Sequence, residues 1–370
     1  MAIPTVAICF GGVSAEHEIS CLTAGGVSKA IDPDRFQVVG IGITKAGKLV
    51  RVSLEQLRAF AVPSSQLPSL SGDYPAACLL QLEEGGVAVA THSPDGLTDV
   101  VPIDVAFPLL HGPFGEDGTI QGWFEMLSLP YVGAGVAASA MSMDKDLTKR
   151  MLSFASLPVV PWVLVTDGEW KADRVRLTGL VAELGYPVFV KPARSGSSVG
   201  MSRVVHERDL DDAIETALRH DPRVIVEAGL VGARELEVAV LQGHFGDPPR
   251  VSRPGEIIVS GNDGFYDYQS KYLDVDYVSL QVPADLTEPT EERLRLLAAR
   301  VFVVMGVEGL ARVDFFLPEG GEPVVNELNT MPGFTTGSLF PRMWEASGVS
   351  YPELVADLID LALERPIGLR

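Results

Sequence analysis

Residues 311–330, ARVDFFLPEGGEPVVNELNT, contain two apolar β-type segments separated by a turn rich in Pro and Gly. This pattern predicts a β-hairpin. Because side chains along a strand alternate between two faces, Glu327 and Asn329 lie on one face of the second strand. If the strands pair in register, Arg312 and Asp314 share that face, and the hairpin carries a cluster of polar side chains.

Carboxylate and amide oxygens of this kind suit Mg²⁺, which takes a couple of carboxylates and completes its shell with phosphate oxygens and water. Arg312 would then lie beside the metal and point at developing negative charge. The alternative is a solvated hairpin face, on which Asp314 and Arg312 form a surface ion pair of little energetic value. The flanking segments VDFFL and PVVNEL are strongly apolar, which places the cluster at the edge of a core and favours the metal site.

A second window, KPARSGSSVG at residues 191–200, follows a strand and leads back into another. Backbone N–H groups and serine hydroxyls in such a turn can cradle phosphate oxygens, and Lys191 adds a mobile positive charge. The alternative is a hairpin turn with an exposed lysine, since Gly- and Ser-rich turns are common. The segment is not a Walker A loop, and no GxGxxG opens a helix after a strand, which disfavours both standard nucleotide folds.

Apolar runs and turn residues divide the chain into α/β segments. Residues 5–12, 36–44 and 103–112 are predicted strands of a first α/β unit, with a helix at 15–31 and a polar surface loop at about 62–75. A small α+β unit follows, with helices at 138–155 and 207–219 and strands at 161–165, 186–192, 199–205 and 223–228. The last unit has strands at 234–243 and in the hairpin, a helix at 291–306, and a polar aromatic segment at 262–276.

Composition limits the classes of function. The chain has 370 residues, is 46% hydrophobic and carries a formal charge of -20. A large acidic excess argues against a protein that grips nucleic acid, since phosphate contacts depend on Lys and Arg. No apolar run reaches the roughly 20 residues that span a bilayer. We therefore expect a cytoplasmic protein with no membrane or nucleic-acid partner, in which Cys9, Cys21 and Cys78 form neither disulfides nor a zinc site.

Seven segments occur in the order in which the ATP-grasp enzymes carry them, and they most closely resemble D-alanine:D-alanine ligases. They are GGVSAEHEIS (11–20), LLHGPFGEDGTIQG (109–122), SMDK (142–145), KPARSGSSVG (191–200), FYDYQSKY (265–272), ARVDFF (311–316) and NELNTMPGFTTGSL (326–339). The resemblance implies a mixed α/β and α+β fold with three domains in the ATP-grasp architecture. These are a Rossmann-like N-terminal domain (1–133), a small central domain (134–228) and a C-terminal domain (229–370), with ATP between the last two.

The resemblance also implies which residues bind the nucleotide. Lys145 and Lys191 would contact the α- and β-phosphates, and Glu235 the ribose hydroxyls. The adenine would meet the backbone of Glu227, Ala228 and Leu230. The other residues expected at the nucleotide are Phe189, Ser198, Phe265, Lys271 and Asn326, with Lys271 on a lid formed by residues 261–272. Asp314, Glu327 and Asn329 match the ligands of two Mg²⁺ ions, for which Mn²⁺ is an alternative.

At the substrates, the resemblance implies that Glu16 holds the ammonium of a first D-alanine, with Ser197 and Tyr272 as its hydrogen-bond partners. His111 would lie near this substrate, and Ser338 and Leu339 would bind the carboxylate of a second D-alanine. Arg312 and the Gly333 N–H would stabilise a tetrahedral oxyanion. Without the resemblance, Glu16 is a first-turn acid that complements a helix dipole, and His111 is a structural histidine.

The implied activity is ATP-dependent joining of two D-alanines through an acyl phosphate, for peptidoglycan precursor synthesis, by a homodimer. Three alternatives remain open: a D-alanine:D-lactate ligase, another carboxylate–amine ligase, and a regulatory module that binds nucleotide without turnover. Tyr272 favours the dipeptide ligase over the depsipeptide ligase. The combination of Arg312 with Asp314, Glu327 and Asn329 argues against a module that only binds, because binding requires no oxyanion stabiliser.

Overall fold

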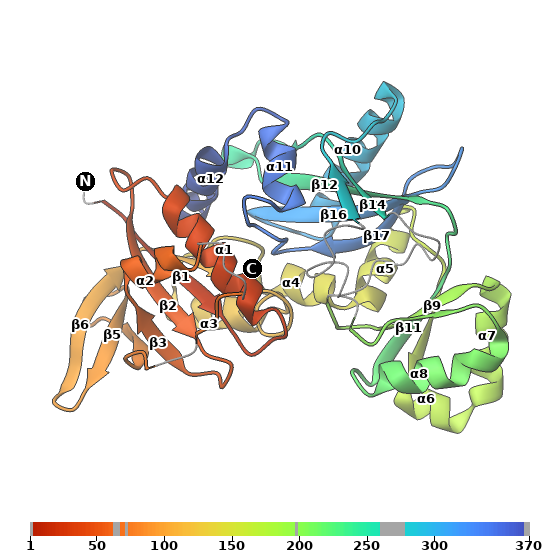
Figure 1. The fold of residues 1–370 in the computed structure, drawn as a ribbon, viewed down its shortest axis with the longest axis horizontal. Helices are drawn as coiled ribbons and strands as arrows, with labels where there is room; N and C mark the ends of the chain where they lie inside the picture. The colour runs from red at the N-terminus through yellow and green to blue at the C-terminus, as the bar shows by residue number, and fades with distance from the viewer. Residues whose placement is uncertain (1–2, 62–66, 71–72, 197–198, 260–277, 366–370) are drawn as a thin grey trace.

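Buried apolar strands form the sheets of three lobes (Figure 1). The computed structural model describes residues 3–61, 67–70, 73–196, 199–259 and 278–365. In Figure 1 the N-terminal lobe lies on the left, the C-terminal sheet on the upper right, and the central lobe on the lower right. The fold is the mixed α/β architecture that the sequence predicts.

The N-terminal lobe is built on a sheet of order β3-β2-β1-β7, in which β1 pairs in parallel with β2 and β7. Every residue of β1 is buried, because helices and a second sheet cover its two faces. The bounds of the sheet and its helices are β1 Thr5–Gly11, α1 His17–Ala30, β2 Gln37–Ile43, β3 Leu49–Val52, α2 Leu54–Ala59, β7 Val105–Leu109 and α3 Thr119–Leu127. The three strands and the helix predicted here are confirmed.

A second, antiparallel sheet of three strands packs on this lobe: β4 Ala77–Gln81, β5 Val87–Ser93 and β6 Gly96–Ile103. The loop predicted at 62–75 lies partly outside the described residues, and the prediction that it is a surface loop is wrong at Leu70. This side chain is only 7% exposed and belongs to the main core, and its backbone N–H donates to His17 Nε2 at 3.2 Å.

The helix predicted at 138–155 is interrupted. It forms α4 Val136–Met143 and α5 Lys145–Phe154, which are separated by Asp144 in an extended conformation. The Asp144 side chain accepts hydrogen bonds from the N–H groups of Asp146 and Leu147, so it caps α5. The break places Lys145 in the first turn of a new helix.

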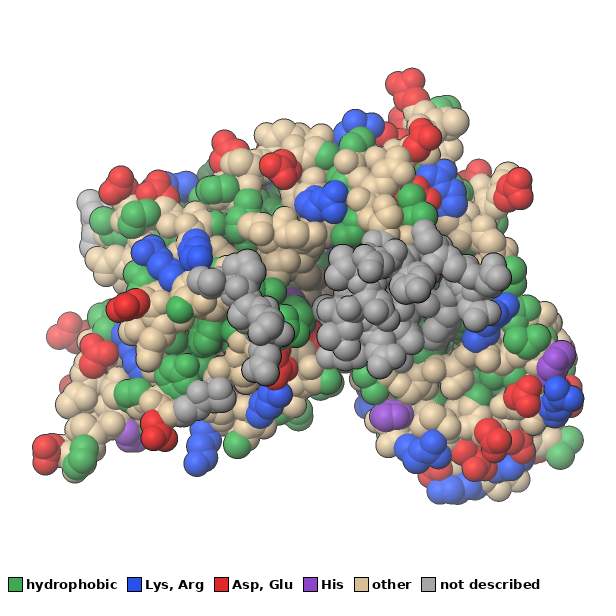
Figure 2. All heavy atoms as spheres, viewed as in Figure 1, with side chains coloured by type: hydrophobic (Ala, Val, Ile, Leu, Met, Phe, Trp, Pro, Cys, Tyr) green, Lys and Arg blue, Asp and Glu red, His purple; other side chains and the backbone are tan. Residues whose placement is uncertain are grey.

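The central lobe is an antiparallel sheet of order β10-β9-β11-β8 covered by helices. Its strands are β8 Trp162–Thr166, β9 Val188–Pro192, β10 Ser202–Val204 and β11 Arg223–Ala228; its helices are α6 Asp167–Ala172, α7 Arg174–Leu184, the 3-10 turn η1 Glu207–Asp209, and α8 Leu210–Leu218. Figure 2 shows acidic and basic side chains interspersed on this lobe.

The C-terminal sheet has the order β15-β14-β12-β16-β17, with β13 paired to β12. Its elements are β12 Arg234–Leu241, η2 His244–Gly246, β13 Arg250–Val251, β14 Gly255–Val259, β15 Val278–Gln281, α10 Glu288–Val304, β16 Leu310–Leu317 and β17 Val324–Asn329. On one face, α10 packs together with α4 and α5 to form a single core. Lys145 is therefore attached to the C-terminal sheet, whereas Lys191 lies on the central lobe.

The last two helices, α11 Leu339–Glu345 and α12 Tyr351–Glu364, connect the C-terminal sheet to the N-terminal lobe. Their apolar side chains share one core with β1, β7 and α1, and Figure 1 shows α12 beside the N-terminal lobe. The core joins the two ends of the chain into one body.

None of the helices among the described residues combines the length and apolar character that crossing a bilayer requires. All three cysteines are described, and none forms a disulfide; Cys9 and Cys21 are buried.

Candidate active site

The hairpin predicted at 311–330 consists of β16 and β17, and its register is the one that places the polar side chains together. Arg312 lies opposite Asn329, and Asp314 lies opposite Glu327. A β-bulge at Asn326 interrupts the pairing directly beyond these two pairs. The pairing confirms that the four side chains share one face.

Arg312 is held by two carboxylates. Its Nε and Nη2 donate to the two oxygens of Asp314 at 2.6 and 2.7 Å, and Nε lies 3.1 Å from Glu237 Oε2. Asn329 Nδ2 donates to Asp314 Oδ2 at 3.0 Å. Burial lowers the pKa of the Arg312 guanidinium, but the opposite charges of Asp314 and Glu237 outweigh this effect. The net pKa is well above the ordinary value. Arg312 is a fixed positive charge beside the carboxylates.

Glu237 is a buried member of this network that the sequence analysis missed. It lies on β12 directly opposite Asp314. The signal was its alternation with Glu235 along an apolar strand, but the sequence does not say that β12 neighbours β16.

Lys191 is the last residue but one of the central-lobe strand β9, and a buried carboxylate holds it. Its Nζ lies 2.5 Å from Glu227 Oε2, and the other oxygen of Glu227 lies 2.7 Å from Lys149 Nζ. Burial raises the pKa of Glu227, but the positive charges of Lys191 and Lys149 outweigh this effect and bring the pKa down to about 2. Burial lowers the pKa of Lys191, but Glu227 and Glu327 raise it above its usual value. Both groups are therefore charged at neutral pH.

Lys149 was also missed by the sequence analysis. It follows Lys145 by four residues and so lies on the same side of α5. That spacing was the available signal, and the buried partner Glu227 could not be inferred from it because β11 is distant in the sequence.

Lys145 lies where three elements meet. Its backbone N–H donates to Ala193 O at 3.0 Å, and its Nζ donates to Ser195 O at 2.7 Å, both in the loop that follows Lys191. Its Nζ also lies 4.0 Å from Glu327 Oε2 on β17. The predicted phosphate lysines and the predicted metal ligands thus face a common region.

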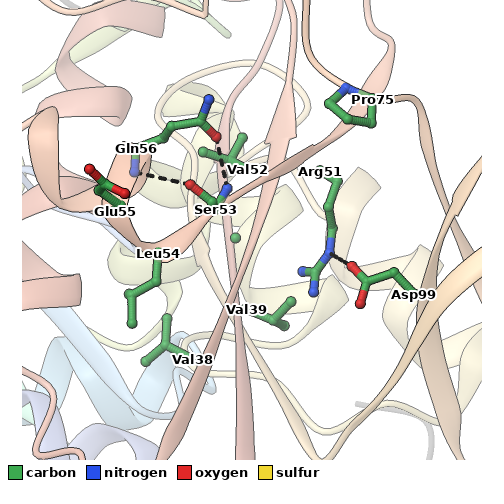
Figure 3. A pocket seen from close by; sticks show the side chains of 11 residues that line it. Val38, Val39, Arg51, Val52, Ser53, Leu54, Glu55, Gln56, Pro75 and Asp99 are labelled. Carbon is green, nitrogen blue, oxygen red and sulfur yellow. Dashed lines mark hydrogen bonds and ion pairs between the residues drawn. The ribbon is translucent and has the colours of Figure 1, made fainter.

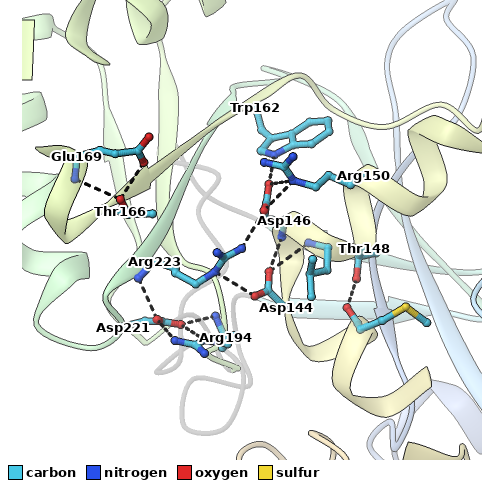
Figure 4. A network of polar contacts seen from close by, with 12 residues as sticks. Asp144, Asp146, Thr148, Arg150, Trp162, Thr166, Glu169, Arg194, Asp221 and Arg223 are labelled. Carbon is cyan, nitrogen blue, oxygen red and sulfur yellow. Dashed lines mark hydrogen bonds and ion pairs between the residues drawn. The ribbon is translucent and has the colours of Figure 1, made fainter. Parts of the chain in front are cut away.

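A network of ion pairs links the central lobe to the start of α5 (Figure 4). Arg223, the first residue of β11, lies 3.2 Å from Asp144 Oδ2 and donates through Nη2 to Asp146 Oδ2 at 2.9 Å. Arg194, in the loop that follows Lys191, donates to both oxygens of Asp221 at 3.0 and 2.7 Å. The network fixes the loop and the start of α5 relative to one another.

Around the predicted adenine site, Glu227 and Ala228 belong to β11, and Phe189 lies opposite Glu227 on β9. The Ala228 N–H is already bonded to Pro161 O at 3.0 Å. By contrast, the Leu230 N–H has no hydrogen-bond partner among the described residues. Glu235 lies on β12, near enough to raise the pKa of Lys191.

Glu16 lies at the start of α1, and its carboxylate faces two glycines from different lobes. A β-carbon built on Gly112 would lie 3.2 Å from Glu16 Oε2, and one built on Gly196 would lie 3.5 Å from the same oxygen. Gly112 belongs to the N-terminal lobe and Gly196 to the loop after Lys191. Glu16 therefore lies next to the predicted phosphate site.

Gly333 and Ser338 lie side by side in the segment after β17. A β-carbon on Gly333 would lie 3.2 Å from Ser338 Oγ, and that hydroxyl accepts from Thr335 N–H at 3.2 Å. The Leu339 side chain is 6% exposed and packs in the main core. Only the backbone of Leu339 can therefore face a ligand.

His111 and Glu116 contact this segment from the N-terminal lobe. His111 Nδ1 lies 3.0 Å from Met331 O, and Glu116 accepts from Met331 N–H at 3.1 Å and from Gly112 N–H at 2.6 Å. Burial raises the pKa of Glu116 to about 8, helped by repulsion from Glu16 and opposed by the two N–H donors. Glu116 was not predicted, although it lies in the GEDG part of a quoted motif.

Five predicted site residues lie outside the described part of the chain: Ser197, Ser198, Phe265, Lys271 and Tyr272. Their roles stay predictions.

A pocket of about 660 Å³ opens elsewhere, on the N-terminal lobe between β2, β3 and α2 (Figure 3). On one wall Arg51 Nε donates to Asp99 Oδ2 at 3.3 Å. None of the predicted site residues that the structure describes lines this pocket.

Models of two families match the chain: "D-ala D-ala ligase N-terminus" over residues 5–134 and "D-ala D-ala ligase C-terminus" over residues 151–360. Among curated proteins, the D-alanine--D-alanine ligase of Arthrobacter sp. (strain FB24) is 50% identical over 373 residues, which cover 100% of this chain and 96% of the relative. That of Paenarthrobacter aurescens (strain TC1) is 48% identical, with 99% and 97% covered.

Solved structures of ligases are also similar to this chain over nearly its full length. The D-alanine-D-alanine ligase from Coxiella burnetii superposes with a TM-score of 0.82 at 32% identity, covering 98% of this chain and 95% of that one. The VanG D-Ala:D-Ser ligase from Enterococcus faecalis has a TM-score of 0.83 at 34% identity, with 98% and 100% covered. Since the two family models together span most of the chain and full-length relatives share about half of its residues, the chain belongs to the D-alanine--D-alanine ligase family.

Proposed function

We propose that this enzyme, an ADP-forming ligase, joins two D-alanines to D-alanyl-D-alanine for peptidoglycan precursor synthesis. Its small-molecule substrates are ATP and D-alanine. The observation that supports this best is the position of Glu16, whose carboxylate lies against Gly196 in the loop that follows Lys191. A carboxylate that can hold an ammonium is thereby next to lysines that can hold phosphates.

The order of chemistry follows from the substrate. A carboxylate is a poor electrophile, so an oxygen of the first D-alanine attacks the γ-phosphorus of ATP, the bond to ADP breaks, and an acyl phosphate forms. We propose that Lys145 and Lys191 stabilise the phosphates during this transfer. Glu227 holds Lys191 in its charged form, which fits that role.

The oxygen donors on the hairpin fit Mg²⁺. Asp314 is neutralised by Arg312, while Glu327 has a long contact of 4.0 Å to Lys145, and Asn329 donates through its nitrogen and so keeps its amide oxygen for a metal. In the described part of the chain no three His, Cys, Asp or Glu side chains form a metal cage on their own. Mg²⁺ takes the rest of its shell from substrate phosphates and water. When bound, Mg²⁺ or Mn²⁺ would neutralise the β- and γ-phosphates.

In the second step the amine of the second D-alanine attacks the acyl carbon, loses a proton, and phosphate leaves. We propose that Arg312 and the Gly333 N–H stabilise the tetrahedral oxyanion, and that Ser338 with the backbone of Leu339 holds the second carboxylate. Because an acyl phosphate hydrolyses when water reaches it, we propose that residues 261–272 close over the site, with Lys271 at the γ-phosphate and Tyr272 and Ser197 at the first substrate.

The other nucleotide contacts are proposals of the same kind. The Leu230 N–H is a donor for adenine, while Phe189, Ser198, Phe265 and Asn326 would line the nucleotide, and Glu235 would bind ribose. We also propose the domain limits 1–133, 134–228 and 229–370, a homodimer, and a cytoplasmic location. Since α4 and α5 pack on the C-terminal sheet, the middle segment divides between two cores.

The test is phosphate release by the purified enzyme with ATP. We expect release only when D-alanine and Mg²⁺ are both present, and a fall of roughly 10²-fold or more in Glu327→Gln. The matched control is Glu322→Gln in the turn of the same hairpin, where the side chain is exposed and pairs with Arg293. Release that does not depend on D-alanine, or full activity in Glu327→Gln, would contradict the proposal.

A further inference from the structure

Glu116 joins two parts of the active site through backbone groups alone. One of its oxygens accepts from Gly112 N–H at 2.6 Å and the other from Met331 N–H at 3.1 Å. Gly112 follows β7 in the N-terminal lobe, while Met331 follows β17 of the C-terminal sheet. One carboxylate therefore bridges two lobes that come from chain segments more than 200 residues apart.

His111 binds the other backbone polar group of Met331. Its Nδ1 lies 3.0 Å from Met331 O, so Nδ1 carries the proton and donates, since a carbonyl only accepts. Glu116 receives the N–H of Met331 and His111 binds its C=O. His111 is 5% exposed, and its Nε2 has no hydrogen-bond partner among the described residues. The backbone of Met331 is thus fixed at both of its polar groups.

Met331 lies between a proposed metal ligand and the proposed oxyanion donor. Met331 is two residues after Asn329 and two before Gly333, whose N–H is the proposed oxyanion donor. Gly112, the other N–H partner of Glu116, lies against the Glu16 carboxylate. A β-carbon built on Gly112 would lie 3.2 Å from Glu16 Oε2. A displacement of Met331 would therefore change the distance between the first-substrate site and the oxyanion donor.

We propose that Glu116 is a positioning residue for the second half of the reaction: with His111, it holds the segment 331–338 at the distance from Glu16 that aligns the amine with the acyl phosphate. The inference rests on the proposed ligation. Both partners of Glu116 are N–H donors, so the position requires a group that accepts at both atoms. The ionised carboxylate accepts with both oxygens, and the protonated acid, which the raised pKa favours at neutral pH, still accepts through the lone pairs of both. Glutamine has nearly the same shape but turns an NH₂ group toward one of the two N–H donors, which leaves that donor without an acceptor.

A neighbouring residue provides a matched control. Asp117 also accepts two backbone N–H groups, from Phe114 at 2.9 Å and from Thr119 at 3.0 Å. Phe114 lies in the same loop as Asp117, and Thr119 begins α3 directly after that loop, so these hydrogen bonds do not connect lobes. Asp117→Asn also replaces a carboxylate that accepts two N–H groups by an amide, in the same loop. It leaves the hydrogen bonds of Glu116 and His111 to Met331 in place.

The experiment measures the ATP consumed for each dipeptide formed, in the wild type, Glu116→Gln and Asp117→Asn. In Glu116→Gln we expect the KM for ATP to stay within about twofold, dipeptide formation to fall roughly 10- to 100-fold, and more than one ATP to be consumed per dipeptide because the unaligned acyl phosphate hydrolyses. We expect one ATP per dipeptide in Asp117→Asn. A protein that is only less stable keeps the ratio at one, so the ratio separates positioning from stability.

A ratio of one in Glu116→Gln with an unchanged KM for the second D-alanine would overturn the inference. If Glu116→Gln does not fold, Glu116→Asp provides the same readout, since it keeps both oxygens but shortens their reach, and a ratio of one there would also overturn it. A wild type that makes no dipeptide would instead reject the proposed function, so the two failures are distinguishable.

Discussion

Glu227 shows how one buried side chain can organise a site. Its side chain is 3% exposed and forms ion pairs with Lys149 and Lys191, which come from two different lobes. A carboxylate removed from water is stable only when it is paired, and the two lysines in turn depend on it. The position of Lys191, which we propose to contact the phosphates, therefore depends on Glu227.

This pairing predicts a pH dependence of stability. The pKa of Glu227 is lowered to about 2 in the folded protein from an ordinary value of 4.5. A depressed carboxylate pKa contributes stability that is fully present above the unfolded value and is lost as pH falls through the folded value. We expect Glu227→Gln to be less stable than the wild type by about 3 kcal/mol at pH 7, and the difference to shrink between about pH 4.5 and pH 2.

Urea unfolding at several pH values measures this difference. Glu215→Gln is the control, because Glu215 pairs with Arg174 on the exposed surface of the central lobe and should change stability little at any pH. A difference between wild type and Glu227→Gln that stays constant down to pH 2 would exclude the proposed ion pairs.

Residue patterns predicted part of this site. Alternation along two strands placed Arg312, Asp314, Glu327 and Asn329 on one face, and the register confirms it. Alternation is local, so it could not assign the partners of Lys149 or Glu237, which depend on strands that are distant in the sequence. Nor could it show that Glu116 reaches Met331 across two lobes.

At the scale of elements, the break between α4 and α5 determines where Lys145 lies. Asp144 caps α5 and also faces Arg223 of the central lobe. The sequence predicted a helix over the whole segment, because its apolar spacing continues through Asp144. Arg223, which follows by 79 positions, lies 3.2 Å from the Asp144 carboxylate, a contact that local sequence spacing does not reveal.

We predict that Arg223→Gln weakens ATP binding, because it removes the ion pairs that hold the central lobe to the start of α5. The loss of one such contact, worth about 1–2 kcal/mol, should raise the KM for ATP roughly tenfold. The KM values for D-alanine should change little, since Glu16 and Ser338 are held by other elements. Steady-state kinetics with each substrate varied in turn measures these constants.

Arg174→Gln is the matched control for this prediction. Arg174 also pairs with two acids, Asp211 and Glu215, but all three lie within the central lobe. Equal effects of the two substitutions on the KM for ATP would show that the connection between lobes is unimportant.

At the scale of the whole molecule, three lobes meet around one region, and the two ends of the chain share a core. Motif order in the sequence predicted the three-part α/β fold, and the family and the solved structures confirm it. The packing of α11 and α12 on the N-terminal sheet was not predictable, because apolar periodicity shows which face of a helix is buried but not what covers it. That packing attaches α11, with Ser338 as its N-cap, to the lobe that carries Glu16.

The chemistry of the second substrate is what separates members of this fold, since a D-Ala:D-Ser ligase is among the structural neighbours. The most direct measurement is a mass analysis of products after incubation with ATP and Mg²⁺ and an equal mixture of D-alanine, D-serine and D-lactate. We predict that D-alanyl-D-alanine is the main product, with one ADP formed per dipeptide. Predominant formation of the D-serine or D-lactate product, or ADP without any ligated product, would contradict the assignment.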